Sequence, residues 1–161
     1  MYVTTFSRQS CYDQAFLQIK IKYSLKFRMA IQILLIEDDE INRFIFKKIA
    51  SQMSRPVDVI TCYNGQSAID YLISYKDTTE KLPDIIFIDL NMPVMNGWKF
   101  IEELSRQNIS KPMRKYILTS SISPDDMEKY ELVVPKLEAY IVKPITKDKL
   151  IEIIDRATPF E

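Results

Sequence analysis

The segment "IIFIDLNMPVMNG" (residues 85–97) places Asp89 directly after four apolar residues and continues through Met92-Pro93 and Asn96-Gly97. An unbroken Ile and Phe run of this length predicts a strand that is buried on both faces. Asn96-Gly97 predicts a turn into the next helix. We therefore expect Asp89 at the carboxyl end of a central strand, where a charge needs a functional reason.

The same order of a short apolar run and a longer amphipathic stretch occurs five times from residue 31 onward. The apolar runs are "IQILLI" (31–36), "VDVITC" (57–62), "DIIFID" (84–89), "KYILTS" (115–120) and "EAYIV" (138–142). Helical spacing follows each of them, at residues 40–53, 65–75, 97–107, 124–133 and 146–157. Such alternation predicts an α/β fold, with a doubly wound, five-stranded parallel sheet and helices on both faces.

The first predicted helix has an apolar face of its own. Its members are Ile41, Phe44, Ile45, Ile49 and Met53. These residues lie near one face of the helix, which makes the segment amphipathic. We expect Asp39 to cap the helix at its start.

Composition limits the classes of function. The chain of 161 residues is 47% hydrophobic, with 22 basic and 22 acidic residues, so total charge does not indicate a nucleic-acid or membrane partner. It contains no histidine, which excludes histidine catalysis and histidine-ligated zinc. Cys11 and Cys62 lack metal-type spacing and are read as free thiols. With no apolar run long enough to span a membrane, we expect a cytoplasmic protein.

Residues 1–29 differ from the rest. The first 30 residues hold five basic side chains and one acidic, and "LQIKIKYSLKF" (17–27) alternates apolar and polar residues as a strand would. One interpretation is an added edge strand, or a strand exchanged with another copy; the preferred one is an extension from an upstream start codon, before Met29-Ala30. We therefore separate an N-terminal extension, residues 1–29, from a domain at residues 30–161.

Polar groups follow four of the five predicted strands. They are Glu37-Asp38-Asp39, Asp89, Thr119-Ser120 and Lys143-Pro144. The carboxyl ends of parallel strands meet at one edge of the sheet, where such folds bind ligands. Converging carboxylates repel one another unless a cation holds them, and an all-oxygen set suits Mg²⁺. A nearby hydroxyl and ammonium would hold phosphoryl oxygens, so Asp89 is the candidate nucleophile for an aspartyl phosphate.

Four of these segments resemble a known family in order and spacing. They are "ILLIEDDE" (33–40), "PDIIFIDLNMPVMNG" (83–97), "YILTSS" (116–121) and "AYIVKP" (139–144). Together they resemble the receiver domain of bacterial two-component response regulators, of the stand-alone, chemotaxis-regulator-like type, over residues 30 to about 157. The resemblance implies a flavodoxin-like (βα)5 fold with strand order 2-1-3-4-5.

The resemblance also implies a role for each site residue. Asp89 would accept a phosphoryl group from a sensor histidine kinase or phosphotransfer protein. Glu37 and Asp38 would bind Mg²⁺ with the Asp89 carboxylate and the backbone carbonyl of Asn91. "EDDE" also permits a second register, Asp38 with Asp39; we prefer Glu37 and Asp38, which follow the apolar run directly.

The remaining implied roles concern the switch. Thr119 and Lys143 would hold phosphoryl oxygens, with Thr119 and Tyr140 as the switch pair, and the bond between Lys143 and Pro144 would be cis. Phosphorylation would then alter the face formed by residues 124–133, the fifth strand and the last helix.

Two other functions remain open at this stage. A magnesium-dependent phosphohydrolase acting through an aspartyl phosphate would need a general acid where Asn91 stands. A phosphorylation-independent interaction domain would keep the fold without the switch. We expect a phosphoacceptor rather than an enzyme, without direct DNA binding, because only "TPFE" follows the last helix. Output would pass through another protein. The cognate kinase, the downstream target and the oligomeric state stay open.

Overall fold

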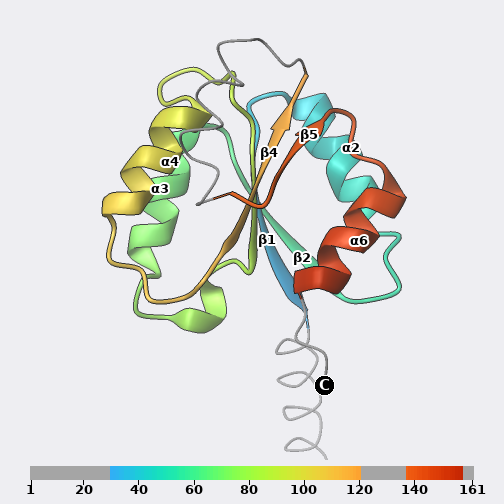
Figure 1. Cartoon of the computed structure of the whole chain (residues 1–161), viewed down its shortest axis with the longest axis horizontal. Coiled ribbons are helices and arrows are strands. Elements are labelled where there is room, and N and C mark those ends of the chain that lie inside the picture. The colour runs from blue at the N-terminus through green and yellow to red at the C-terminus, as the bar shows by residue number, and fades with distance from the viewer. Residues whose placement is uncertain (1–29, 121–136, 158–161) are drawn as a thin grey trace, which may run out of the picture. The chain divides into compact units, whose positions relative to one another are not determined.

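The computed structural model describes residues 30–120 and 137–157. The expectations for the extension 1–29 and for a helix at 124–133 lie outside the described residues. Within the described part, five strands form one parallel sheet in the order β2-β1-β3-β4-β5 (Figure 1). The strands are β1 (Ile31–Ile36), β2 (Val57–Cys62), β3 (Ile85–Ile88), β4 (Arg114–Thr119) and β5 (Ala139–Val142). The predicted doubly wound fold and its strand order are therefore confirmed.

Helices cover both faces of the sheet. The described helices are α2 (Glu40–Ala50), α3 (Gly65–Ser74), α4 (Gly97–Arg106), α6 (Lys147–Ala157) and the short 3-10 helix η1 (Thr79–Lys81). The α3 and α4 helices pack on one face, and α2 and α6 pack on the other (Figure 1). Each face thus has its own apolar core, and the central strands are enclosed between the two.

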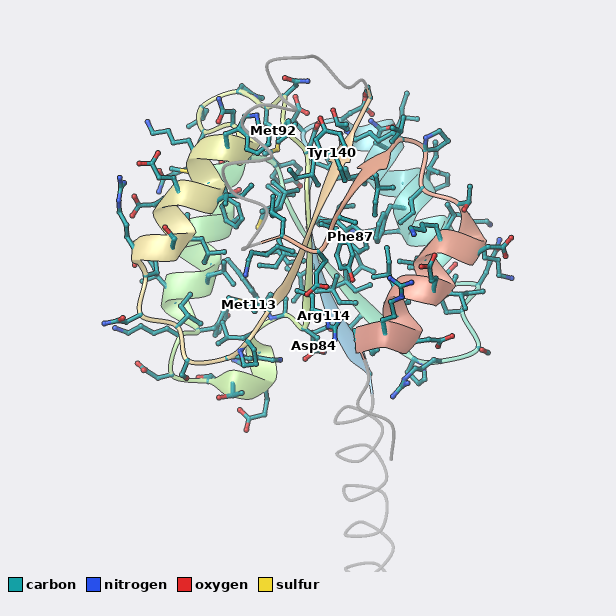
Figure 2. All side chains as sticks on the ribbon, in the orientation of Figure 1. Asp84, Phe87, Met92, Met113, Arg114 and Tyr140 are labelled. Carbon is teal, nitrogen blue, oxygen red and sulfur yellow. The ribbon has the colours of Figure 1, made fainter. Side chains whose placement is uncertain are left out.

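The central strands are buried as the continuous apolar runs predict. Every residue of β1 and β3 is buried. Phe87 of β3 lies in the middle of the sheet, its ring centroid 5.0 Å from that of Phe46 and 5.5 Å from that of Tyr116 (Figure 2). Asp84 and Arg114 lie at the amino edge of the same strands (Figure 2). Asp89, directly after β3, therefore lies at the opposite, carboxyl edge.

Helix α2 is rotated relative to its predicted apolar stripe, of which Ile49 packs against the core. Phe46 and Ala50, one turn apart, are its buried residues, whereas Ile41 and Phe44 are 69% and 68% exposed. The contact of Phe46 with Phe87 sets the rotation of the helix about its axis. Local spacing could not reveal this rotation, because the apolar residues cover a wide arc of α2 and contact with the sheet decides which part of it is buried.

Side-chain caps start the helices that follow the site strands. Asp39 accepts a hydrogen bond from the backbone N–H of Asn42 at 2.9 Å, and Asn96 accepts one from Lys99 at 2.9 Å. These caps satisfy backbone donors at the first turn of each helix. They start α2 shortly after the end of β1 and start α4 after the loop that follows β3, so both helices begin beside the acidic residues.

Candidate functional site

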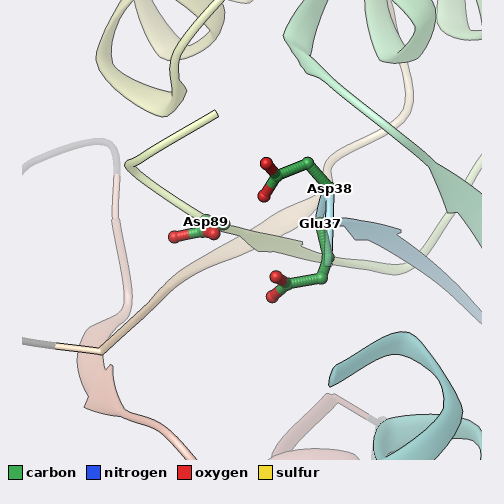
Figure 3. Close-up of side chains that lie close together, drawn as sticks. All are labelled: Glu37, Asp38 and Asp89. Carbon is green, nitrogen blue, oxygen red and sulfur yellow. The ribbon is translucent and has the colours of Figure 1, made fainter. Parts of the chain in front are cut away.

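Three carboxylates meet at the carboxyl edge of the sheet. Glu37 and Asp38 directly follow β1, and Asp89 follows the neighbouring strand β3 (Figure 3). The backbone continues the sheet at this level, since Asp89 N–H donates to the Ile36 carbonyl at 2.9 Å. One carboxylate oxygen from each of the three acids lies within 4.8 Å of the others. The structure thus brings together acids that are 52 residues apart in sequence.

Burial raises the electrostatic free energy of this cluster of carboxylates. Glu37 is 1% exposed and Asp89 is 5% exposed, whereas Asp38 lies on the exposed rim. Two nearby charges withdrawn from water repel each other strongly unless positive charge compensates them. The site therefore requires a counter-ion.

Lys143 supplies one positive charge. Its Nζ lies 2.6 Å from Glu37 Oε2 and 2.8 Å from Asp89 Oδ2, and its side chain is only 9% exposed. Its backbone N–H donates to the carbonyl of Thr119 at 2.7 Å, and the peptide bond to Pro144 is cis. One ammonium faces three carboxylates, so the cluster retains negative charge that a further cation can neutralise.

The oxygens present fit Mg²⁺. Glu37 Oε2 is buried and accepts no directed hydrogen bond from the described residues, its contact with Lys143 being an ion pair. Its other oxygen accepts from Asn42 Nδ2 at 3.2 Å. Mg²⁺ prefers carboxylate and carbonyl oxygens and keeps part of its water shell, which the exposed rim at Asp38 allows. Asp39 caps α2 instead, so the grouped set is Glu37, Asp38 and Asp89.

Burial also changes the ionisation of Glu37. Loss of solvation raises the pKa of the Glu37 carboxyl above its ordinary value of 4.5, Lys143 and Asn42 lower it, and the Asp89 carboxylate adds to the rise. A neighbouring divalent cation would favour the charged form in the same way as Lys143.

We expect Glu37→Gln to change how the stability of the metal-free protein depends on pH. Because the pKa of Glu37 is raised on folding, the folded state keeps this proton to higher pH than the unfolded chain. The resulting stabilisation is complete below pH 4.5 and is lost as the pH rises through the folded-state pKa. Urea unfolding in EDTA should show wild type losing stability relative to Glu37→Gln as the pH rises over this range.

The control for this measurement is Glu80→Gln, which changes an exposed glutamate in η1. Its unfolding free energy should follow that of wild type at every pH. Parallel pH profiles for wild type and Glu37→Gln would contradict the assignment of the raised pKa to this carboxyl.

The other predicted site residues lie around the same edge. Thr119 ends β4 and is fully buried, and Tyr140 of β5 is half-buried against the core beneath α3 and α4. Asn91 is exposed in the loop after Asp89, and its backbone N–H donates to Asp89 Oδ1 at 3.3 Å. The loop therefore orients the carboxylate from its own backbone.

Three further residues at the site were not assigned site roles from the sequence. Asn42 donates a hydrogen bond to the Glu37 carboxylate, and Arg43 donates to the backbone carbonyls of Glu37 and Asp38. Gly97 begins α4 against the backbone of Asp89, where a Cβ would lie 2.4 Å from the Asp89 carbonyl oxygen. Helical position alone did not distinguish these residues from ordinary polar or turn residues.

Gly97→Ala should destabilise the protein, although this exchange normally stabilises a helix by up to about 1 kcal/mol. The added methyl group would overlap the Asp89 carbonyl and push α4 away from the end of β3. We expect a loss of about 1–3 kcal/mol in the free energy of unfolding, measured by urea titration. Ser105→Ala, in the exposed last turn of α4, is the control and should stay within about 0.5 kcal/mol of wild type. Equal stability of Gly97→Ala and wild type would contradict the close approach.

A cavity of about 430 Å³ lies away from this cluster of carboxylates. It is lined by the end of α4, the following loop and the start of β4, including Lys111 and Lys115. No carboxylate lines it. This cavity is therefore separate from the site formed by Glu37, Asp38 and Asp89.

Within residues 30–120 and 137–157, none of the helices is both long and apolar enough to cross a bilayer.

Comparison with known proteins gives a consistent picture. The family model described as "Response regulator receiver domain" matches residues 33–155. Chemotaxis protein CheY of Listeria monocytogenes is 27% identical over 127 residues, which cover 79% of this chain and 98% of that protein. The span matched by the family model includes β2 to β5 and most of β1, and it contains Glu37, Asp38, Asp89, Thr119 and Lys143.

Solved structures agree in fold. A two-component response regulator from Cytophaga hutchinsonii superposes with a TM-score of 0.70 at 29% identity, covering 80% of this chain and 97% of that one. The phosphorylated cyanobacterial phytochrome response regulator RcpA gives a TM-score of 0.63 at 26% identity, covering 79% and 90%. In each case the matched region is nearly the whole of the other chain.

Proposed function

Because this chain belongs to the response regulator receiver domain family, we propose that it is the phosphoacceptor of a two-component phosphorelay, with Asp89 as the residue modified. The observation that carries the proposal is the ion pair of Lys143 with both Glu37 and Asp89 at the carboxyl edge. A lysine ammonium paired with the buried acceptor carboxylate is placed to bind the phosphoryl oxygens that would form there.

The chemistry assigned to Asp89 is attack of a carboxylate oxygen on phosphorus. The phosphorus–nitrogen bond of a phosphohistidine donor breaks, its electron pair returns to the imidazole, and an acyl phosphate forms on Asp89. The Asn91 N–H holds Asp89 Oδ1 and leaves Oδ2 to Lys143. As Oδ2 changes from carboxylate to ester-like oxygen, Lys143 turns to the new phosphoryl oxygens.

We assign the cation site to the carboxylates of Glu37, Asp38 and Asp89 together with the backbone carbonyl of Asn91. When bound there, Mg²⁺ supplies positive charge against the phosphoryl oxygens. The support is the three-carboxylate group and the buried Glu37 oxygen that only an ion pair satisfies. In this assignment Asp39 serves as the cap of α2, which favours the Glu37 and Asp38 register.

The switch is assigned to Thr119 and Tyr140. Thr119 lies at the end of β4, next to β5, which carries Tyr140. The backbone N–H of Lys143 donates a hydrogen bond to the Thr119 carbonyl. A hydroxyl drawn toward the phosphoryl group would leave room that the half-buried Tyr140 ring can enter. The readout is a shift between two pre-existing conformations of the face that includes β5 and α6.

The proposed partners are a sensor histidine kinase or phosphotransfer protein as donor and a separate protein as receiver of the signal. The exposed Ile41, Phe44 and Ile45 of α2 offer an apolar surface to a protein donor, and Ile45 lines the same small cavity as Glu37 and Lys143. Residues 30–161 form the receiver domain in this proposal, with residues 1–29 as an extension.

The test is phosphorylation with a small donor. Incubation with acetyl phosphate and Mg²⁺ should add one phosphoryl group per chain, detected by intact-mass spectrometry, and EDTA should prevent it. The adduct should be labile to hydroxylamine, as an acyl phosphate is. If no condition produces an adduct, the proposal fails.

An assay of the same protein on simple phosphate esters distinguishes this function from phosphate-ester hydrolysis. Asn91 carries an amide where a phosphohydrolase would need a carboxylic acid to protonate the leaving group. We therefore propose that the chain supports only its own phosphorylation and dephosphorylation. Multiple turnovers on simple phosphate esters would overturn this part.

A further inference from the structure

Arg43, in the first turn of α2, binds the backbone of Glu37 and Asp38 rather than their carboxylates. Its Nη1 donates to the backbone carbonyl of Glu37 at 2.7 Å and to that of Asp38 at 2.7 Å. The guanidinium thus binds the two consecutive carbonyls and leaves the carboxylates of the same residues to other partners. A guanidinium paired with those carboxylates would instead compete with a cation for them.

A second element holds the guanidinium itself. The Cζ of Arg43 lies 4.5 Å from the centroid of the Tyr63 ring, a cation–π contact. Tyr63 directly follows β2, and the carbonyl of Cys62 accepts the backbone N–H of Glu37 at 3.0 Å. The turn that carries Glu37 and Asp38 is therefore bound from β2 on one side and from Arg43 on the other.

We propose that Arg43 is a positioning residue for the cation site, supported by the ring of Tyr63. The inference rests on the proposed function, because it concerns Mg²⁺ at Glu37, Asp38 and Asp89. By fixing both carbonyls, Arg43 fixes the backbone dihedrals from which the two carboxylates project. Neighbouring Asn42 holds the Glu37 carboxylate itself, so the first turn of α2 orients both the backbone and the side chain.

The sign of the effect distinguishes positioning from charge alone. Arg43 is a cation beside a proposed cation site, so its charge opposes Mg²⁺ binding. If charge were its whole contribution, a neutral replacement would strengthen binding and lysine would leave it unchanged. If Arg43 positions the turn, both replacements weaken binding. Methionine has no donor for the two carbonyls that Nη1 binds, and the ammonium of lysine lies one bond nearer to the backbone than Nη1, so it reaches them less well.

The experiment is calorimetric titration of the full chain with MgCl₂. Arg43→Met and Arg43→Lys should each raise the Kd for Mg²⁺ by about 10-fold or more, the range typical of residues that orient metal ligands. With acetyl phosphate, the rate at saturating Mg²⁺ should stay within about threefold of wild type, while the Mg²⁺ concentration for half-maximal rate rises with the Kd. General unfolding would lower the maximal rate as well.

Tyr63 provides a matched pair of variants. Tyr63→Phe keeps the ring and should bind Mg²⁺ as wild type does, whereas Tyr63→Leu removes it and should weaken binding several-fold. In the Arg43→Met background, Tyr63→Leu should add little, since the ring acts through the guanidinium. These variants test the same support even if Arg43→Met folds poorly, because Tyr63 is 60% exposed and lies outside the buried core.

The failures are distinguishable. Wild-type Mg²⁺ binding with unchanged or tighter binding in Arg43→Lys and Arg43→Met would overturn the positioning role and leave the proposed function standing. Additive effects of Tyr63→Leu and Arg43→Met would overturn the support assigned to the ring. Absence of Mg²⁺ binding by wild type would overturn this inference together with the cation site of the proposed function.

Discussion

Asp89→Asn is expected to abolish phosphoryl uptake from acetyl phosphate, the largest effect that any single substitution here should have. The amide has nearly the shape of the carboxylate and can still accept the Asn91 N–H through its oxygen. It lacks the anionic oxygen that attacks phosphorus, and it cannot pair with Lys143 as a charge. Intact-mass spectrometry should show the unmodified chain only, at any concentration of donor and Mg²⁺.

The control is Asp58→Asn, which makes the same exchange at an exposed position of β2. This variant should take up one phosphoryl group at the wild-type rate. A full adduct on Asp89→Asn would mean that another side chain is the acceptor, and peptide mapping of the adduct would identify it.

Lys143→Met should produce the largest loss of stability. The ammonium is nearly buried and pairs with two buried carboxylates, at 2.6 Å and 2.8 Å. Methionine keeps much of the volume and removes the charge, so Glu37 and Asp89 would face each other without a counter-ion. Breaking a buried ion pair from one side costs about 3–5 kcal/mol, and we expect a loss of this size in EDTA, measured by urea unfolding.

Two comparisons make this prediction specific. Added Mg²⁺ should recover part of the loss in Lys143→Met, because a cation held by the same carboxylates replaces the missing charge. Lys149→Met removes the ammonium of an exposed pair with Glu152 and should cost less than about 1 kcal/mol. If Lys143→Met and Lys149→Met unfolded at the same urea concentration, the ion pairs of Lys143 would not stabilise the fold.

Local pattern was sufficient for most of the fold. The apolar runs predicted all five strands to within a residue or two, because a strand enclosed on both faces must be apolar throughout. Asp39 caps α2 as its sequence position indicated, and Asn96-Gly97 forms the predicted turn into α4, where Asn96 is the cap. The grouping of Glu37, Asp38, Asp89 and Lys143 was also predictable, since every parallel strand delivers its last residue to the same edge.

Contacts within the site depended on more than strand order. The sequence did not indicate that α2 would bury Phe46 and Ala50 while exposing Ile41 and Phe44. That rotation is decided by packing against Phe87, a residue 41 positions away, and it also decides where Asn42 and Arg43 point.

The sequence by itself therefore determined the elements, their order and the edge where the acids gather. These follow from the periodicity of apolar side chains in strands and helices and from the residues that favour turns, both of which act over a few residues. Only the tertiary structure decided that Lys143 lies between Glu37 and Asp89, that Arg43 binds two carbonyls, and that Gly97 must lack a side chain. Those arrangements depend on strand register and helix rotation, which are set by contacts between residues far apart in the chain.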